Sequence, residues 1–242
     1  MTVLNNDLLS VSRNLQGIRD SIRELCLECG RNPDEIMLEA VTKTVAPEII
    51  NYAIENGVSV IGENKVQELN EKLDRLSLEH CKVHLIGHLQ TNKVKDIIGK
   101  ASMIESVDSL HLAKEIDKQA EKADLHQDIL LQVNIGKDPN KFGFGGEELE
   151  QAVRDIAVFP NLFIRGLMTI LPFSDNREEK MQLFGDMYHL FIDIKAKNID
   201  NVSMDYLSMG MSHDYKEAIL CGANIIRVGT ALFGARNYNG GN

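Results

Sequence analysis

Lys43 is the residue of this sequence whose position most suggests chemistry. It directly follows the apolar run 36–42, which has the composition of a buried β-strand, and Pro47 then opens a helical pattern. A side chain at the carboxyl end of a strand that feeds a helix points into the mouth of an α/β fold, where substrates and cofactors bind. The Lys43 amine could react with a carbonyl compound there, or it could be a solvated lysine whose stem covers apolar neighbours.

A second set of residues, near the C-terminus, could hold a phosphate group. Ser212 separates a strand-like run from a helical one, so we expect it to be an N-cap with backbone N–H groups exposed beside it. At the end of the last strand-like run, Gly229 permits close backbone approach and Thr230 offers a hydroxyl. Strand alternation places Arg227 on the same side as Gly229, so Arg227 should point into the fold and requires an acceptor. Ser212 and Gly229 also have a purely structural interpretation, as a cap and a turn.

A reactive amine, a phosphate cradle and an inward arginine together indicate pyridoxal 5'-phosphate as the ligand. Its aldehyde would meet Lys43, and its ring nitrogen would face Arg227. Its phosphate would lie against Ser212, Gly229 and Thr230, because barrels commonly bind phosphate in the loops after strands seven and eight.

These residues are far apart in the sequence, so the fold must bring them together. Apolar periodicity predicts a leading helix over residues 3–29, within a leading segment 1–30. Eight strand-like runs alternate with helical patterns after it. The runs are 36–42, 58–62, 83–86, 103–107, 129–135, 163–170, 204–209 and 225–232, and the helical patterns are 47–55, 65–76, 109–123, 147–158, 177–197 and 214–220. We expect an α/β fold, a single (β/α)8 TIM barrel over residues 1–242 with a loose tail at 235–242; an open doubly wound sheet is the competing architecture.

Composition and charge narrow the class of protein. The chain has 242 residues, 43% hydrophobic content and a formal net charge of -10, so its overall field disfavours nucleic acid and anionic lipid. No apolar run approaches the roughly 20 residues needed to span a bilayer, and no secretory signal opens the sequence. We therefore expect a cytoplasmic protein. Four scattered cysteines do not form a disulfide framework, and the CxxC pair Cys26 and Cys29 has no partner motif that would complete a zinc site.

Several motifs, taken in order, resemble the pyridoxal phosphate homeostasis protein family, and the resemblance covers nearly the whole chain. The matching stretches are AVTK at 40–43, GEN at 62–64 followed by VQE at 66–68, HLIGHLQTNK at 84–93, QVNI at 132–135, GLMT at 166–169, LSMGMS at 207–212 and RVGT at 227–230. The resemblance implies a barrel similar to the N-terminal domain of bacterial alanine racemase, with the cofactor held as an aldimine on Lys43. By carry-over, the cofactor-binding residues are Lys43, Asn64, Met211, Ser212, Arg227, Gly229 and Thr230.

The resemblance favours a cofactor carrier over an enzyme. An arginine opposite the ring nitrogen weakens the ring as an electron sink, and the sequence leaves no room after the eighth strand for a second domain that would supply a tyrosine base. We expect a monomer without metal ligands or catalytic residues, which balances intracellular vitamin B6 and delivers the cofactor to apo-enzymes. Two alternatives are a racemase or lyase of low activity that uses His88 or a partner subunit as base, and a Schiff-base aldolase for phosphorylated sugars. His213 is a further candidate proton carrier.

Glu39 is the departure from the family pattern that raises a question. It alternates with Val41 and Lys43 on one face of the first strand. Either it is an interior carboxylate paired with a base, or the strand twists it outward.

Overall fold

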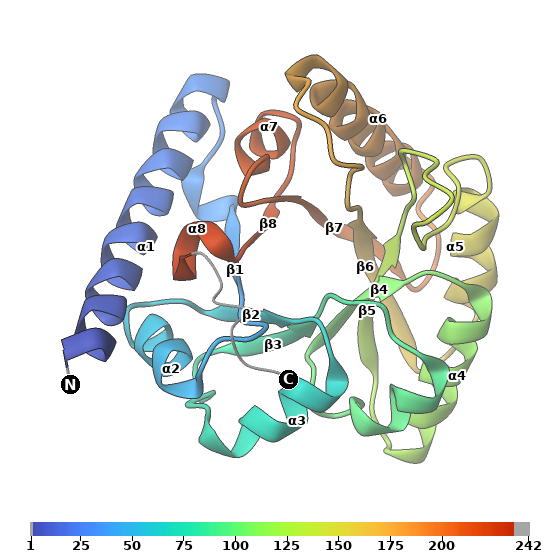
Figure 1. Ribbon diagram of the computed structural model, residues 1–242. Helices are drawn as coiled ribbons and strands as arrows, with labels where there is room; N and C mark the ends of the chain where they lie inside the picture. Colours follow the sequence, from blue (N-terminus) through green and yellow to red (C-terminus); the bar gives the residue numbers. More distant parts are fainter. Residues whose placement is uncertain (1, 235–242) are drawn as a thin grey trace.

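The computed structural model describes residues 2–234, and its centre is a closed barrel of eight parallel strands (Figure 1). The strands are β1 (Met37–Val41), β2 (Val60–Glu63), β3 (Lys82–Leu85), β4 (Met103–Val107), β5 (Gln127–Gln132), β6 (Leu162–Met168), β7 (Val202–Met211) and β8 (Ile225–Val228). They neighbour one another in chain order, and β1 pairs with β8. The expected (β/α)8 barrel is confirmed, because an open sheet would leave its first and last strands unpaired.

Helices surround the barrel on the outside (Figure 1). They are α1 (Thr2–Cys29), α2 (Pro47–Glu55), α3 (Val66–Lys72), α4 (Leu110–Lys122), α5 (Leu149–Ala157), α6 (Arg177–Ala196), α7 (Tyr215–Leu220) and α8 (Thr230–Phe233). A 3-10 helix, η3 (Thr91–Asp96), stands between β3 and β4 where the other connections carry α-helices. The leading helix α1 contacts α2, α7 and α8, and so closes the side of the barrel where its first and last strands meet.

Both faces of the strands are buried, which explains why they are continuous apolar runs in the sequence. The larger hydrophobic cluster lies between strands and helices and includes Ile61, Ile104 and Phe184. A smaller cluster is formed by Met103, Leu130, Met168 and Ile225. Burial at this scale is the dominant favourable term in folding.

The last apolar run differs from the prediction. A strand was expected over 225–232, but β8 ends at Val228 and Thr230 already begins α8. Leu232 is fully buried in the large cluster, and its carbonyl accepts a hydrogen bond from the side chain of Asn14 in α1. A buried helical turn is as apolar as a strand, so composition alone could not separate the two. The expected tail 235–242 lies outside the described residues.

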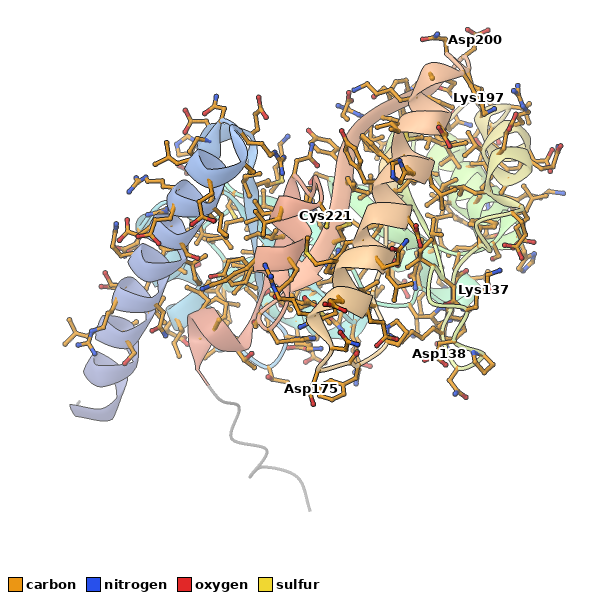
Figure 2. The ribbon with its side chains drawn as sticks, turned by 90° about the horizontal axis from the view of Figure 1, so that it is seen from above. Lys137, Asp138, Asp175, Lys197, Asp200 and Cys221 are labelled. Carbon is orange, nitrogen blue, oxygen red and sulfur yellow. The ribbon has the colours of Figure 1, made fainter. Side chains whose placement is uncertain are left out.

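The two ends of the barrel are built from different connections, as Figure 2 shows. Asp138 and Asp175, in the loops that follow β5 and β6, lie at one end, whereas Lys197 and Asp200, between α6 and β7, lie at the other. Polar side chains at the carboxyl ends of the strands therefore share the first end. Within residues 2–234, no helix combines the length and the apolar character needed to cross a bilayer.

Candidate functional site

A cavity of about 190 Å³ opens at the carboxyl end of the barrel, and all seven residues predicted as cofactor-binding line it. They are Lys43, Asn64, Met211, Ser212, Arg227, Gly229 and Thr230, and their neighbours in the lining are Val41, Ile86, Ile170 and His213. The seven lie on β7 and β8, at the start of α8, or in the turns that follow β1, β2, β7 and β8, so only barrel closure brings them together. Whether they bind a cofactor stays a prediction.

Lys43 is the middle residue of segment 42–44, which we call the strap. Hydrogen bonds hold the strap on both sides of the lysine. Thr42, just before it, is fully buried and donates its hydroxyl to Glu63 Oε1 at 2.7 Å. Thr44, just after it, has a left-handed backbone with φ of 63°, and its N–H donates to Glu68. A non-glycine residue in that conformation is uncommon and persists only where its surroundings impose it. The strap therefore fixes the backbone from which the lysine amine extends.

Lys72 of α3 connects the strap to two glutamate side chains. Its ammonium donates to the Thr42 carbonyl at 2.8 Å, to Glu63 Oε1 at 2.8 Å and to Glu68 Oε1 at 2.7 Å. Burial raises the pKa of Glu63, and the hydrogen bonds from Lys72 and Thr42 only partly offset that rise. Burial would also raise the pKa of Glu68, but the hydrogen bonds from Lys72 and the Thr44 N–H outweigh it and lower that pKa. Sequence reasoning missed Lys72, because it resembles an ordinary helix-surface lysine.

Ser212 lies at the other side of the cavity, where two backbone donors converge. Its hydroxyl oxygen accepts from the Gly229 N–H at 3.1 Å and from the Ala231 N–H at 3.2 Å. The expectation that Ser212 is the N-cap of the following helix is wrong, because α7 begins later and its N-cap is Asp214. Because these two N–H groups donate to its oxygen, the Ser212 hydroxyl keeps its proton for another acceptor, and a phosphate oxygen in the cavity suits that role.

Asn64 and Met211 are placed by close backbone packing. Asn64 follows β2, and a Cβ atom on Gly87 would lie 2.1 Å from its carbonyl oxygen. Only glycine at position 87 therefore lets the turn after β3 approach Asn64. Met211 is the last residue of β7 and is the register partner of Arg227 on β8, which brings both to the same wall of the cavity.

Arg227 points into the barrel beneath the cavity, as strand alternation predicts, and only 3% of its surface is exposed. Its guanidinium donates to the Ser208 hydroxyl at 2.6 Å and to the Thr169 carbonyl at 2.7 Å. A guanidinium does not lose its charge in proteins, so Arg227 remains a donor toward the cavity at any physiological pH. A ring nitrogen placed opposite it would be an acceptor.

A row of buried polar side chains continues below Arg227. The Ser208 hydroxyl donates to Glu105 Oε2 at 2.6 Å, and Glu105 Oε1 lies 2.9 Å from His84 Nδ1. Glu39 lies on the other side of this histidine, with Oε1 at 3.3 Å from His84 Nδ1. Glu39 is fully buried, so the interior interpretation holds and the outward one is wrong. Glu105 and Ser208 were not singled out from the sequence, although a glutamate inside the apolar run 103–107 was a usable signal.

The two candidate proton carriers differ in position. His88 pairs through Nδ1 with Asp108 Oδ2 at 2.9 Å and stacks on Phe142 with ring centroids 3.7 Å apart, and it is not part of the cavity lining. His213 does line the cavity, and its Nε2 lies 3.2 Å from Asp214 Oδ2. The geometry therefore places His213, not His88, beside a ligand in this cavity.

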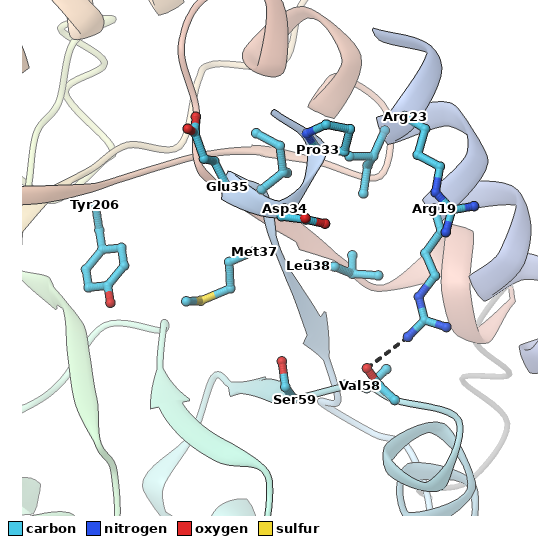
Figure 3. Close-up of a pocket in the computed structure, with 13 residues that line it drawn as sticks. Arg19, Arg23, Pro33, Asp34, Glu35, Met37, Leu38, Val58, Ser59 and Tyr206 are labelled. Carbon is cyan, nitrogen blue, oxygen red and sulfur yellow. Dashed lines mark hydrogen bonds between the residues drawn. The ribbon is translucent and has the colours of Figure 1, made fainter. Parts of the chain in front are cut away.

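A larger cavity of about 520 Å³ lies at the opposite end of the barrel, between α1 and the start of β1 (Figure 3). Its arginines are already engaged: Arg19 donates to the Gly57 carbonyl at 2.8 Å, and Arg23 pairs with Asp20 at 3.0 Å. None of the predicted site residues lines it. The CxxC pair is also away from the chemistry, with Cys26 buried and Cys29 exposed, and both are free thiols.

The closed barrel, with a cavity lined by Lys43 and Arg227 at its carboxyl end, defines the class of alanine racemase-type barrels. The sequence model of the family described as "Alanine racemase, N-terminal domain" matches residues 14–237. Alanine racemase of Clostridium difficile has the same fold, with a TM-score of 0.76 and 16% identity over 95% of this chain and 58% of the racemase. That likeness concerns the fold alone.

Within that class, the chain belongs to the pyridoxal phosphate homeostasis protein family. The homeostasis protein of Aquifex aeolicus is 39% identical over 230 residues, which covers 95% of this chain and 100% of the relative. The Escherichia coli K12 protein of the same name is 33% identical over 232 residues, covering 95% and 98% of the two chains. The solved structure of PipY from Synechococcus elongatus with PLP bound has a TM-score of 0.81 and 30% identity, over 93% of this chain and 100% of PipY.

Proposed function

We propose that this protein binds pyridoxal 5'-phosphate on Lys43 and takes part in vitamin B6 homeostasis by holding the cofactor rather than by using it in catalysis. The observation that carries the proposal is the convergence of seven residues from distant segments on one cavity. An amine, an inward guanidinium and a serine hydroxyl oriented by two backbone N–H groups match the three polar functions of this cofactor. The homeostasis names of the relatives and the PLP-bound PipY structure support the same reading.

Each group of the chain has a role in this proposal. Bound pyridoxal phosphate supplies an aldehyde that reacts with amines and a ring that can accept electrons. Lys43, fixed by its strap, presents the attacking amine, while the Ser212 hydroxyl, oriented by the Gly229 and Ala231 N–H groups, donates to the phosphate. Arg227 donates toward the ring nitrogen and keeps a proton off it. An unprotonated ring is a poor electron sink, so the site favours retention over carbanion chemistry.

A carrier must also release its cofactor, and we propose that apo-enzymes that require pyridoxal phosphate are the recipients. Mixing loaded protein with such an apo-enzyme should restore its activity even when a scavenger consumes free cofactor. Restoration that disappears with the scavenger would show that release into solution is the only route.

Borohydride reduction followed by peptide mass measurement separates the three functional hypotheses. The carrier hypothesis predicts a pyridoxyl group fixed on Lys43 and no racemisation or decarboxylation of amino acids above background. Sustained turnover of an amino acid, lost in His213→Ala, would establish the racemase or lyase alternative instead. A sugar-derived adduct on Lys43 would establish the aldolase alternative.

A further inference from the structure

Glu39, His84 and Glu105 form a buried group beneath the cavity, which we call the floor relay. The three side chains come from β1, β3 and β4, and each is almost fully buried. One ligand-type atom from each lies within 4.8 Å of the others. None of the seven proposed cofactor-binding residues belongs to this group. The Ser208 hydroxyl nevertheless connects the group to Arg227, because it donates to Glu105 and accepts from the Arg227 guanidinium.

The two carboxylates of the floor relay differ in their hydrogen bonds. Glu105 accepts hydrogen bonds on both oxygens, from His84 and from Ser208. Neither oxygen of Glu39 makes a well-formed hydrogen bond in the described part of the chain, and its nearest cationic neighbour, His84 Nδ1, lies 3.3 Å from Oε1 and closer to Glu105. Glycine at position 62 on β2 makes room for it, because a Cβ there would lie 2.7 Å from Glu39 Oε1. In a barrel core, an ionised carboxylate that makes no close hydrogen bond and shares its histidine with a second carboxylate is costly, and a proton or a cation would lower that cost.

Protonation is the least costly way to neutralise the Glu39 carboxylate. Burial, and next the charge of Glu105, raise the pKa of Glu39 to about 7, against the lowering effect of His84 and Arg227. Burial would lower the pKa of His84, but the carboxylates of Glu105 and Glu39 beside its ring outweigh burial and raise that pKa to about 9. Among the described residues, those are the ionisable groups that act most strongly on Glu39 and His84, and on the β2 side Gly62 faces Glu39.

The charge balance explains why a proton is preferred over a metal ion. With His84 protonated, its charge and that of Arg227 balance the two carboxylates when Glu39 is ionised. Protonation of Glu39 then leaves one net positive charge under the cavity. A divalent cation would first have to displace the His84 proton, and it would leave Arg227 beside an already neutral group.

We propose that the floor relay stores a proton under the cavity, and that loss of this proton as pH rises weakens the hold on an anionic cofactor. Glu105 is then a positioning residue for Arg227, because it fixes the Ser208 hydroxyl that the guanidinium contacts. The part that concerns the cofactor rests on the proposed function. The part that concerns protonation of the barrel core does not.

The test compares wild-type protein with Glu39→Gln and Glu39→Leu, of which the second removes the carboxylate if the buried amide impairs folding. Thermal midpoints of cofactor-free protein are measured from pH 5.5 to 8. Wild type should lose stability as pH rises from 5.5 to 7, because ionisation of Glu39 is costly there, whereas both variants should lose less over that interval and melt higher than wild type at pH 8. The slope that remains in the variants belongs to His84, which Glu105 still contacts. Glu121→Gln, an exposed change on α4, is the control and should keep the wild-type slope.

The second readout is the dissociation constant for pyridoxal phosphate over the same pH range. Wild type should lose about tenfold more affinity than Glu39→Gln between pH 6 and 8, the scale expected for one charge near the site at intermediate dielectric. Equal melting slopes in all three proteins would overturn the inference. So would stoichiometric metal in the purified protein, with chelator lowering the wild-type midpoint but not that of Glu39→Leu. A wild-type melting slope steeper than that of both Glu39 variants, with no cofactor binding at any pH, would instead overturn the proposed function and leave the proton store standing.

Discussion

Replacement of Lys72 by methionine tests whether the strap around Lys43 depends on a buried ion pair. Lys72→Met keeps most of the side-chain volume but removes the three hydrogen bonds that the ammonium donates to Thr42, Glu63 and Glu68. Glu63 is fully buried, so the variant leaves an uncompensated carboxylate inside the protein. Breaking a buried pair in this way costs about 3–5 kcal/mol.

The expected loss is large enough to measure by thermal or urea denaturation. For a chain of this size a loss of about 3–5 kcal/mol lowers the melting temperature by roughly 6–20 °C. The pH dependence gives a second check. Without its cation, Glu63 has a pKa even further above its ordinary value, so the native state of the variant takes up a proton as pH falls. The deficit relative to wild type should therefore shrink between pH 8 and pH 5.

Lys118→Met on α4 is the matched control. Its ion pair with Glu115 spans 3.6 Å and the Lys118 side chain is 58% exposed, so its removal should cost about 0–1 kcal/mol. If Lys72→Met is as stable as this control at pH 8, the ion-pair account of the strap is refuted. Intact stability with a lost hold on the cofactor would likewise contradict a structural role for Lys72.

Two further substitutions probe the cavity walls. Ser212→Ala removes the hydroxyl on which two backbone N–H groups converge and should weaken pyridoxal phosphate binding about tenfold, as expected for one charge-assisted hydrogen bond, in a fluorescence titration. An unchanged dissociation constant would remove Ser212 from the proposed phosphate site. Gly87→Ala should cost about 1–3 kcal/mol in urea denaturation, because its Cβ would press on the Asn64 carbonyl. Gly185→Ala on α6, where a Cβ meets nothing within 4 Å, is the control and should be neutral or stabilising.

The fold was predictable because each part of it leaves a local signal. Parallel strands buried on both faces are apolar runs, and eight of them alternating with amphipathic helices favour closure into a barrel. The position of the candidate site, at the carboxyl ends of the strands, was predictable for the same reason. Lys43 and Asn64 each stand where an apolar run gives way to polar residues, and that edge becomes the cavity. Met211 was named only because the sequence resembles the family, and it lines the same cavity.

What could not be predicted depends on contacts between distant segments. Lys72 is buried only because α3 packs behind the strap, and nothing in a helix pattern distinguishes it from an exposed lysine. Ser212 was expected to cap the helix that follows it. Its hydrogen-bond partners, the Gly229 and Ala231 N–H groups, instead lie at the start of α8, whose apolar sequence resembles a strand. The partners of Glu39 lie on β3 and β4, so its surroundings follow from barrel register, which no single strand reveals.

The absorption spectrum of the protein loaded with pyridoxal phosphate tests the central claim most directly. Wild type should show a visible band that the free cofactor lacks, and Lys43→Ala should lose that band while keeping its fold by circular dichroism. Lys65→Ala, an exposed lysine close by in the sequence, should retain the band. A band of full intensity in Lys43→Ala, or none in wild type at saturating cofactor, would contradict attachment of the cofactor at Lys43.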